Sequence, residues 1–126
     1  MHNELKGVGT AIVTPFHKDG TIDFKSLQKL VEFQIKGKVD YLVALGTTGE
    51  SVTLNKDEKN AVISTVIETV DSRIPVVIGI GGNNTQEVVN TIKSTDFDGV
   101  TAILSVTPYY NKPQQRGIFL HHRFSR

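Results

Sequence analysis

Four short apolar runs recur along the chain, and the segments between them carry apolar residues at helical spacing. The runs occupy residues 7–14, 41–45, 75–79 and 99–106. Short runs of this kind, rich in branched apolar residues and bounded by glycine or proline, are typical of strands buried in a parallel sheet. Successive runs begin about thirty residues apart, which is the size of a strand–helix–strand unit. The pattern predicts four strands joined by three helices.

The segments between the runs also carry helix start and stop signals. Asp23 is a suitable N-cap for the first helix, and Gly37 can end it. Asn55 and Glu58 have the spacing of a capping box at the start of the second helix, and Asn84 repeats the cap for the third. The second helix is rich in β-branched residues, but its apolar side chains follow a helical stripe and do not alternate. The stripe consists of Val62, Ile63, Val66, Ile67 and Val70.

This order of elements fits two α/β architectures. Parallel strands joined by helices form either an open, doubly wound sheet or a barrel. The length of 126 residues fits one domain, and the 38% of hydrophobic residues is enough for a modest core. From the residues alone, both architectures stay open.

Composition excludes several classes of protein. The net charge of +1, from 14 basic and 13 acidic residues, indicates neither a nucleic-acid nor a membrane partner. The absence of cysteine excludes a disulfide scaffold, and none of the four histidines has zinc-ligand spacing to an acid, so no metal site is expected. No apolar run is long enough for a signal peptide or a membrane span. We therefore expect a cytoplasmic protein.

Three loops follow strands at the same edge of the predicted sheet, where active-site groups gather in α/β folds. Residues 46–51 (GTTGES) combine glycines, which let a ligand approach the backbone, with hydroxyls and amides that suit an oxyanion. An ordinary loop leading into a helix is the alternative. Residues 79–82 (GIGG) do not complete a dinucleotide-binding fingerprint, because its third glycine would fall at Asn84, so a tight turn is expected.

The third loop contains Tyr109 and Tyr110 between two prolines. These rings either pack at the edge of the loop or relay protons through a threonine hydroxyl. The lysines lie on polar helix faces or in turns. None lies within an apolar strand, where burial would lower its pKa for Schiff-base chemistry.

Taken together, five motifs resemble the dihydrodipicolinate synthases (4-hydroxy-tetrahydrodipicolinate synthases) over about residues 7–118. They are residues 7–16 (GVGTAIVTPF), 46–51 (GTTGES), 53–54 (TL), 79–84 (GIGGNN) and 106–113 (VTPYYNKP). The related sialic acid lyases tend to have serine in place of Thr47, which favours the synthases.

The resemblance implies a fold and an activity. The fold is a (β/α)8 TIM barrel, of which this chain holds the N-terminal half, with four βα units and the last one incomplete. The activity is that of a lyase in lysine and diaminopimelate biosynthesis. It condenses pyruvate with L-aspartate semialdehyde through a lysine Schiff base, and it needs no cofactor.

The resemblance also assigns roles to residues. Thr48 is expected to bind the pyruvate carboxylate, and Thr47 and Tyr110 are expected to relay protons. The family forms homotetramers in which the tyrosine at the position of Tyr110 crosses the tight-dimer interface into the neighbouring site. Some members are inhibited by lysine at that interface, through residues that correspond to Ser51, Asn83, Glu87 and Tyr109.

Two features depart from the family. Lys56 and Lys59 stand where lysine-sensitive members often have histidine, so weak or absent inhibition is expected. A complete barrel needs about 250 residues. The Schiff-base lysine, a second relay tyrosine and the arginine for the semialdehyde belong to the later half.

We therefore expect one truncated domain over residues 1–126 that is inactive alone, with 119–126 as a non-native tail. The alternatives are a fragment of an N-acetylneuraminate lyase or another pyruvate-dependent aldolase, and a non-catalytic half-barrel module.

Overall fold

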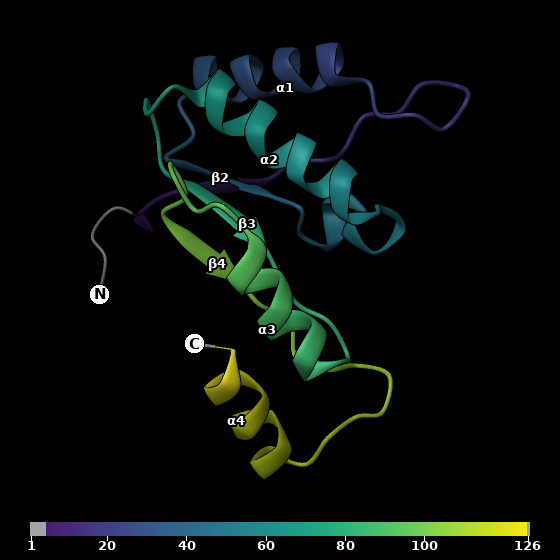
Figure 1. The fold of residues 1–126 in the computed structure, drawn as a ribbon. Coiled ribbons are helices and arrows are strands. Elements are labelled where there is room, and N and C mark those ends of the chain that lie inside the picture. Colours follow the sequence, from purple (N-terminus) through teal and green to yellow (C-terminus); the bar gives the residue numbers. More distant parts are fainter. Residues whose placement is uncertain (1–4, 126) are drawn as a thin grey trace.

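Four parallel strands form one sheet in which each strand lies beside the next in the sequence (Figure 1). The structure is a computed structural model and describes residues 5–125. The strands are β1 (Gly9–Ala11), β2 (Tyr41–Ala44), β3 (Val76–Gly79) and β4 (Ala102–Leu104). The helices are α1 (Phe24–Lys36), α2 (Lys56–Val70), α3 (Thr85–Ser94) and α4 (Gln115–Phe124).

The sequential strand order decides between the two architectures. Crossovers between parallel strands are almost always right-handed, so a chain that always adds its next strand on the same side places every helix on one face. A doubly wound sheet instead reverses its direction and covers both faces. The order β1-β2-β3-β4 is therefore that of a barrel, and the fold is the N-terminal half of a TIM barrel.

The core lies between the sheet and the first two helices, which run side by side in Figure 1. Leu42 and Ile78 point from β2 and β3 into it and are fully buried. The predicted apolar stripe of α2 belongs to the same core. Four of its five residues are buried, and Ile67 is partly buried and packs against the core. Burial of these branched side chains offsets their lower helix propensity.

The N-caps predicted for three helices are all confirmed, including Asn84 at the start of α3. Asp23 accepts a hydrogen bond from the amide of Ser26 (2.9 Å), and Gly37 caps the other end of α1. Asn55 and Glu58 exchange the two bonds of a capping box, at 2.8 and 2.9 Å. Together these contacts satisfy amides that a helix start leaves without partners.

All four strands are shorter than predicted, for different local reasons. β1 stops at Ala11, and Pro15, which has no amide hydrogen, lies where the chain leaves the sheet. β2 ends at Ala44 because Leu45 has a φ of 56°, outside the strand region. Gly99 has a φ of 76° and forms a turn, so β4 begins only after it. Apolar runs therefore overestimate strand length where the backbone turns inside the run.

The last helix lies beside α3 and apart from the sheet (Figure 1). It includes residues 119–124 of the segment expected to be a tail. His121 is 3% exposed, and its Nδ1 lies 2.7 Å from the Thr85 hydroxyl at the start of α3. One buried histidine therefore joins the two helices. Within residues 5–125, no helix has the length and apolar character needed to cross a membrane.

This contact should make the docking of α4 sensitive to pH. Burial lowers the pKa of His121 below its ordinary value of 6.5, and the nearby His122 lowers it further. As the pH falls through 6.5, the unfolded chain takes up a proton at this ring before the folded chain does, so the folded state loses stability. We expect the protection factors of the α4 amides, which compare exchange rates with those of an unfolded chain at the same pH, to fall below this pH while those of α2 stay high, as measured by hydrogen exchange.

The matched control is His121→Asn, whose side-chain amide can still bond Thr85 but does not titrate in this range. The fall in protection of the α4 amides at low pH should disappear in this variant. The same pH dependence in both proteins would rule out His121 as its source.

Candidate active site

The carboxyl ends of β2, β3 and β4 open into the three loops that the sequence analysis singled out. In parallel strands these ends lie at one edge of the sheet. The loops meet around a groove of about 470 Å³. Thr47 lines it from the first loop, Gly81 from the second, and Val106 and Tyr109 from the third. The predicted convergence of the three loops is therefore present.

The first loop consists of two short 3₁₀ turns, η2 (Thr47–Gly49) and η3 (Ser51–Thr53). Glu50 joins them in the left-handed conformation, with a φ of 54°. Thr47 and Thr48 are exposed, and their hydroxyls have no hydrogen-bond partner among the described residues. The loop thus presents two free hydroxyls, and of the two threonines Thr47 lines the groove whereas Thr48 does not.

A buried threonine holds this loop in place. The hydroxyl of Thr14 donates a 2.7 Å hydrogen bond to the carbonyl of Gly49, and Thr14 is 5% exposed. Gly49 is also buried, and a Cβ there would lie 3.3 Å from the carbonyl oxygen of Ile12. Sequence analysis did not identify this role of Thr14, because its partner lies 35 positions away along the chain.

Leu45 directs the chain from β2 into the loop. Its φ of 56° is unusual for a bulky residue, and its side chain is 3% exposed. The carbonyl of Leu45 packs so closely on Gly79 that a Cβ at Gly79 would collide with it. Core packing and the missing side chain of Gly79 together hold this strained turn in place.

The predicted tight turn at residues 79–82 is wrong, because this segment forms no hydrogen-bonded turn and the amide of Ile80 donates to Leu104 in β4 instead. Gly79 and Gly81 are needed for a different reason, the close approach of neighbouring backbones. A Cβ at Gly81 would lie 2.8 Å from the amide nitrogen of Val106. The three loops therefore contact each other directly through glycine.

The two tyrosines of the third loop have different surroundings. Tyr109 lines the groove, whereas Tyr110 is 79% exposed and does not line it. Their amides both donate to Oδ1 of Asn83, at 2.7 and 2.9 Å. The high exposure of Tyr110 argues against the packing interpretation for that ring. No hydrogen bond joins Tyr110 to Thr47 in the part of the chain that the structure describes.

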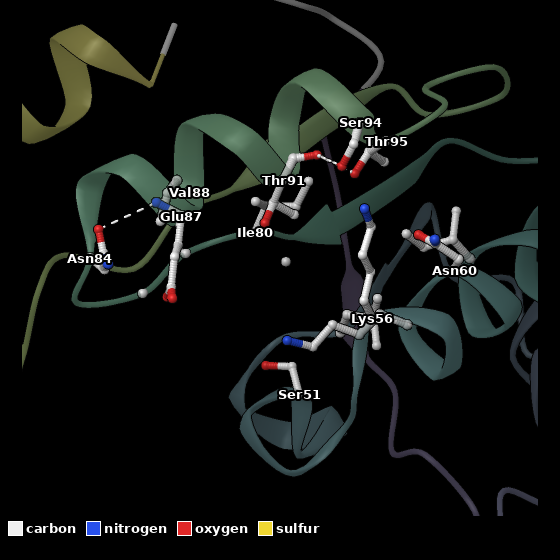
Figure 2. Close-up of a pocket in the computed structure, with 16 residues that line it drawn as sticks. Ser51, Lys56, Asn60, Ile80, Asn84, Glu87, Val88, Thr91, Ser94 and Thr95 are labelled. Carbon is white, nitrogen blue, oxygen red and sulfur yellow. Dashed lines mark hydrogen bonds between the residues drawn. The ribbon is translucent and has the colours of Figure 1, made fainter.

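A second cavity of about 220 Å³ lies between α2 and α3 (Figure 2). Ser51 and Lys56 line one side of it, and Glu87 lines the other. Lys59 also lines it, and no ion pair joins these two lysines to Glu87 among the described residues. The groove and this cavity share a wall formed by Leu45, Ser51, Gly79, Ile80 and Gly81.

The residues predicted to contact an inhibitory lysine are therefore divided between the groove and the second cavity. Ser51 faces both, Glu87 faces the cavity, Tyr109 faces the groove, and Asn83 lines neither. Their role in binding lysine stays a prediction. Over residues 5–125, no cluster of three or more histidine, aspartate or glutamate side chains is placed to hold a metal ion.

No lysine of residues 5–125 lines the groove. Among the described residues, Lys59 is half-buried and every other lysine is exposed. The groove thus offers hydroxyls, backbone amides and apolar walls, a combination that can hold a small carboxylate and move protons between neutral groups.

Comparison with known proteins identifies the family that this chain matches. The sequence model of the dihydrodipicolinate synthetase family matches residues 4–124. A 4-hydroxy-tetrahydrodipicolinate synthase of Parabacteroides distasonis is 51% identical over 119 residues, and one of Flavobacterium psychrophilum is 53% identical over 115. These alignments cover 94% and 91% of this chain but 40% and 39% of the relatives. The chain spans about 40% of the length of the curated relatives it matches.

Solved structures give the same result. The dihydrodipicolinate synthase of Thermotoga maritima superposes with a TM-score of 0.91 and 44% identity, over 98% of this chain and 41% of that one. A chloride-inhibited dihydrodipicolinate synthase of Acinetobacter baumannii, solved in complex with pyruvate, gives a TM-score of 0.90 and 45% identity, over 94% of this chain and 41% of that one.

The contact between Leu45 and Gly79 can be tested by adding one methyl group. In Gly79→Ala the new Cβ meets backbone atoms of Leu45 and Gly46, which cannot rotate away. We expect a loss of about 2 kcal/mol or more in the free energy of unfolding, as for overpacked sites. Urea denaturation would measure it.

Gly82→Ala is the matched control, because its Cβ would lie at an ordinary 3.7 Å from Val88. It should change the stability by about 0.5 kcal/mol or less. Equal losses in the two variants would contradict a specific collision at Gly79.

Proposed function

The chain belongs to the dihydrodipicolinate synthetase family, and from that membership we propose that it forms the first part of the active site of a 4-hydroxy-tetrahydrodipicolinate synthase. Such an enzyme is a lyase that condenses pyruvate with L-aspartate semialdehyde in lysine biosynthesis. The observation that carries the proposal is the groove where three strand-end loops meet, lined by Thr47, with the exposed hydroxyl of Thr48 on the same short loop. The pyruvate complex of the Acinetobacter baumannii relative supports a small 2-oxo acid as ligand.

Thr48 and its neighbours suit the carboxylate of pyruvate. Besides the two hydroxyls, the amides of Thr47 and Thr48 donate no hydrogen bond to the described backbone, whereas the amides of Gly49 and Glu50 are already used within η2. Hydroxyl and amide donors on one short segment bind an oxyanion without an added cation. We assign Thr48 to this contact.

Thr47 and Tyr110 suit the transfer of protons. When a lysine amine adds to the carbonyl of pyruvate, the carbinolamine must lose its hydroxyl as water, so a proton has to reach that oxygen. A hydroxyl and a phenol can pass it on without leaving a fixed charge beside the intermediate. The 79% exposure of Tyr110 leaves its phenol accessible to a second protomer, as expected if it crosses a dimer interface in a homotetramer.

The Schiff-base lysine is assigned to the remainder of the barrel. An amine that forms an imine at neutral pH needs a lowered pKa, which burial in apolar surroundings provides. Every described lysine of this chain is exposed or half-buried, and none lines the groove. We therefore propose that this chain binds and orients pyruvate but does not hold it covalently, and that it is inactive alone.

A chimera tests the roles of these residues. This chain would replace the corresponding segment of the Parabacteroides distasonis synthase, to which it is 51% identical. The chimera should condense pyruvate with aspartate semialdehyde. Thr47→Val and Tyr110→Phe should each lower kcat by about a hundredfold or more, the usual effect of losing acid–base catalysis, and Thr48→Val should mainly raise the KM for pyruvate.

The control for Tyr110→Phe is Tyr41→Phe, at the opposite end of β2, which should leave kcat unchanged. Equal kcat values in these two variants would contradict the relay. A folded chimera that cleaves N-acetylneuraminate but does not form the condensation product would favour the alternative lyase.

Borohydride trapping tests the position of the covalent lysine. Incubation of this chain with pyruvate and borohydride should give no stoichiometric adduct, because no described lysine is buried. The chimera should give one adduct, located by peptide mass spectrometry in the segment from the relative. A single modified lysine in this chain would show that the covalent step had been assigned to the wrong half.

A further inference from the structure

Asn83 connects two of the loops that form the groove. It lies in the loop between β3 and α3, and its Oδ1 accepts hydrogen bonds from the amides of Tyr109 (2.7 Å) and Tyr110 (2.9 Å). Along the sequence, Asn83 is separated from Tyr109 by 26 positions and from Tyr110 by 27 positions. A carbonyl oxygen has two lone pairs, so one side chain can hold both amides at once.

The loop that contains the two tyrosines has little else to hold its middle. Over the described chain, no amide or carbonyl of residues 105–113 takes part in a backbone–backbone hydrogen bond outside the regular elements. The start of the loop packs on Gly81, and its end leads into α4. Between these points, the two bonds to Asn83 are the only hydrogen bonds that the described structure records for the loop.

The position of the Tyr110 ring depends on this support. Tyr110 is 79% exposed, so its ring has little packing to hold it. An exposed side chain samples several rotamers, and the region that its phenol can reach is then set by its backbone. Fixing the amide of Tyr110 limits the space in which the phenol moves.

Asn83 itself stands on a rigid base. The next residue, Asn84, caps α3 by accepting from the amides of Gln86 (3.0 Å) and Glu87 (3.3 Å). On the other side, Ile80 donates from its amide to the carbonyl of Leu104 in β4 (3.0 Å). The acceptor oxygen of Asn83 is therefore held between a strand end and a helix start.

We propose that Asn83 is a positioning residue, which holds the backbone of Tyr109 and Tyr110 so that the Tyr110 phenol reaches the reacting centre. This inference rests on the proposed synthase function for its catalytic part, whereas its structural part depends on the two hydrogen bonds alone. It gives Asn83 a role different from contact with an inhibitory lysine, and Asn83 does not line the cavity of Figure 2.

The first experiment measures hydrogen exchange in this chain by NMR. Asn83→Ala removes the acceptor, so the amides of Tyr109 and Tyr110 should exchange about fivefold faster or more, the factor for one hydrogen bond of ordinary strength. Asn83→Asp keeps an acceptor oxygen at the same place and should restore the slower exchange. Asn111→Ala, in the same loop and with no recorded hydrogen bond from its side chain, is the matched control and should change neither amide.

Each rate is compared with the α2 amides in the same sample. A variant that merely destabilised the fold would speed up both sets, so the ratio separates loosening of the loop from general loss of stability. Asn83→Ser, whose hydroxyl is too short to hold both amides, provides a second variant with the same expected loss. An unchanged ratio in the alanine and serine variants would overturn the proposed support, whatever the activity of the protein.

The second experiment measures kinetics in the chimera described above. Asn83→Ala should lower kcat by about tenfold to a hundredfold, as for a misplaced catalytic group, while the KM for pyruvate stays the same. Asn83→Asp should recover most of the lost kcat. If Tyr110→Phe lowers kcat and Asn83→Ala does not, the positioning role is wrong.

If Tyr110→Phe itself has no effect, the relay is wrong, and the catalytic part of this inference fails with it. The exchange experiment still decides the structural part. Failure of the proposed function and failure of the Asn83 contact therefore give different results.

Discussion

The close approach of two backbones, at Leu45 and Gly79, is the constraint on which the rest of this site depends. Leu45 is buried in a left-handed conformation, and its carbonyl occupies space that any side chain at position 79 would need. The chain leaves β2 at this point, so the contact sets the direction of the loop with Thr47 and Thr48. The same residues form part of the wall between the groove and the second cavity. A change at this contact would therefore alter the shapes of both the groove and the second cavity.

The loops differ in how they are held. The first loop is fixed by a buried hydrogen bond from Thr14 and by glycine packing, so its hydroxyls stand on a rigid support. The third loop depends on one exposed side chain, Asn83, for the hydrogen bonds of its middle. Exposed hydrogen bonds open more readily than buried ones. The structure thus combines a loop held by a buried hydrogen bond with one held in its middle by exposed hydrogen bonds.

The sequence predicted those features that depend on local spacing. The caps at Asp23 and Asn55 and the helical stripe of α2 involve residues a few positions apart, and the structure has them as predicted. Long-range contacts had no such signal. The bond from Thr14 to Gly49 spans 35 positions of the sequence, and the bonds from the two tyrosine amides to Asn83 span 26 and 27 positions. Nothing in the sequence indicates that these residues meet. The choice between barrel and open sheet also depended on strand order, which hydrophobic spacing does not encode and which only the family resemblance supplied.

The residues with clearly shifted pKa values lie outside the groove. In the described chain the clear shifts belong to Asp19, Asp23, Glu32, Arg73 and His121, and none of these residues lines the groove. The lowered pKa of His121 reflects its burial between α3 and α4. A perturbed pKa marks a site when that site works through a charged group. The site proposed for this part of the barrel works through neutral hydroxyls and amides, so its candidate residues are recognised by their free hydrogen-bonding groups and by the loops that hold them.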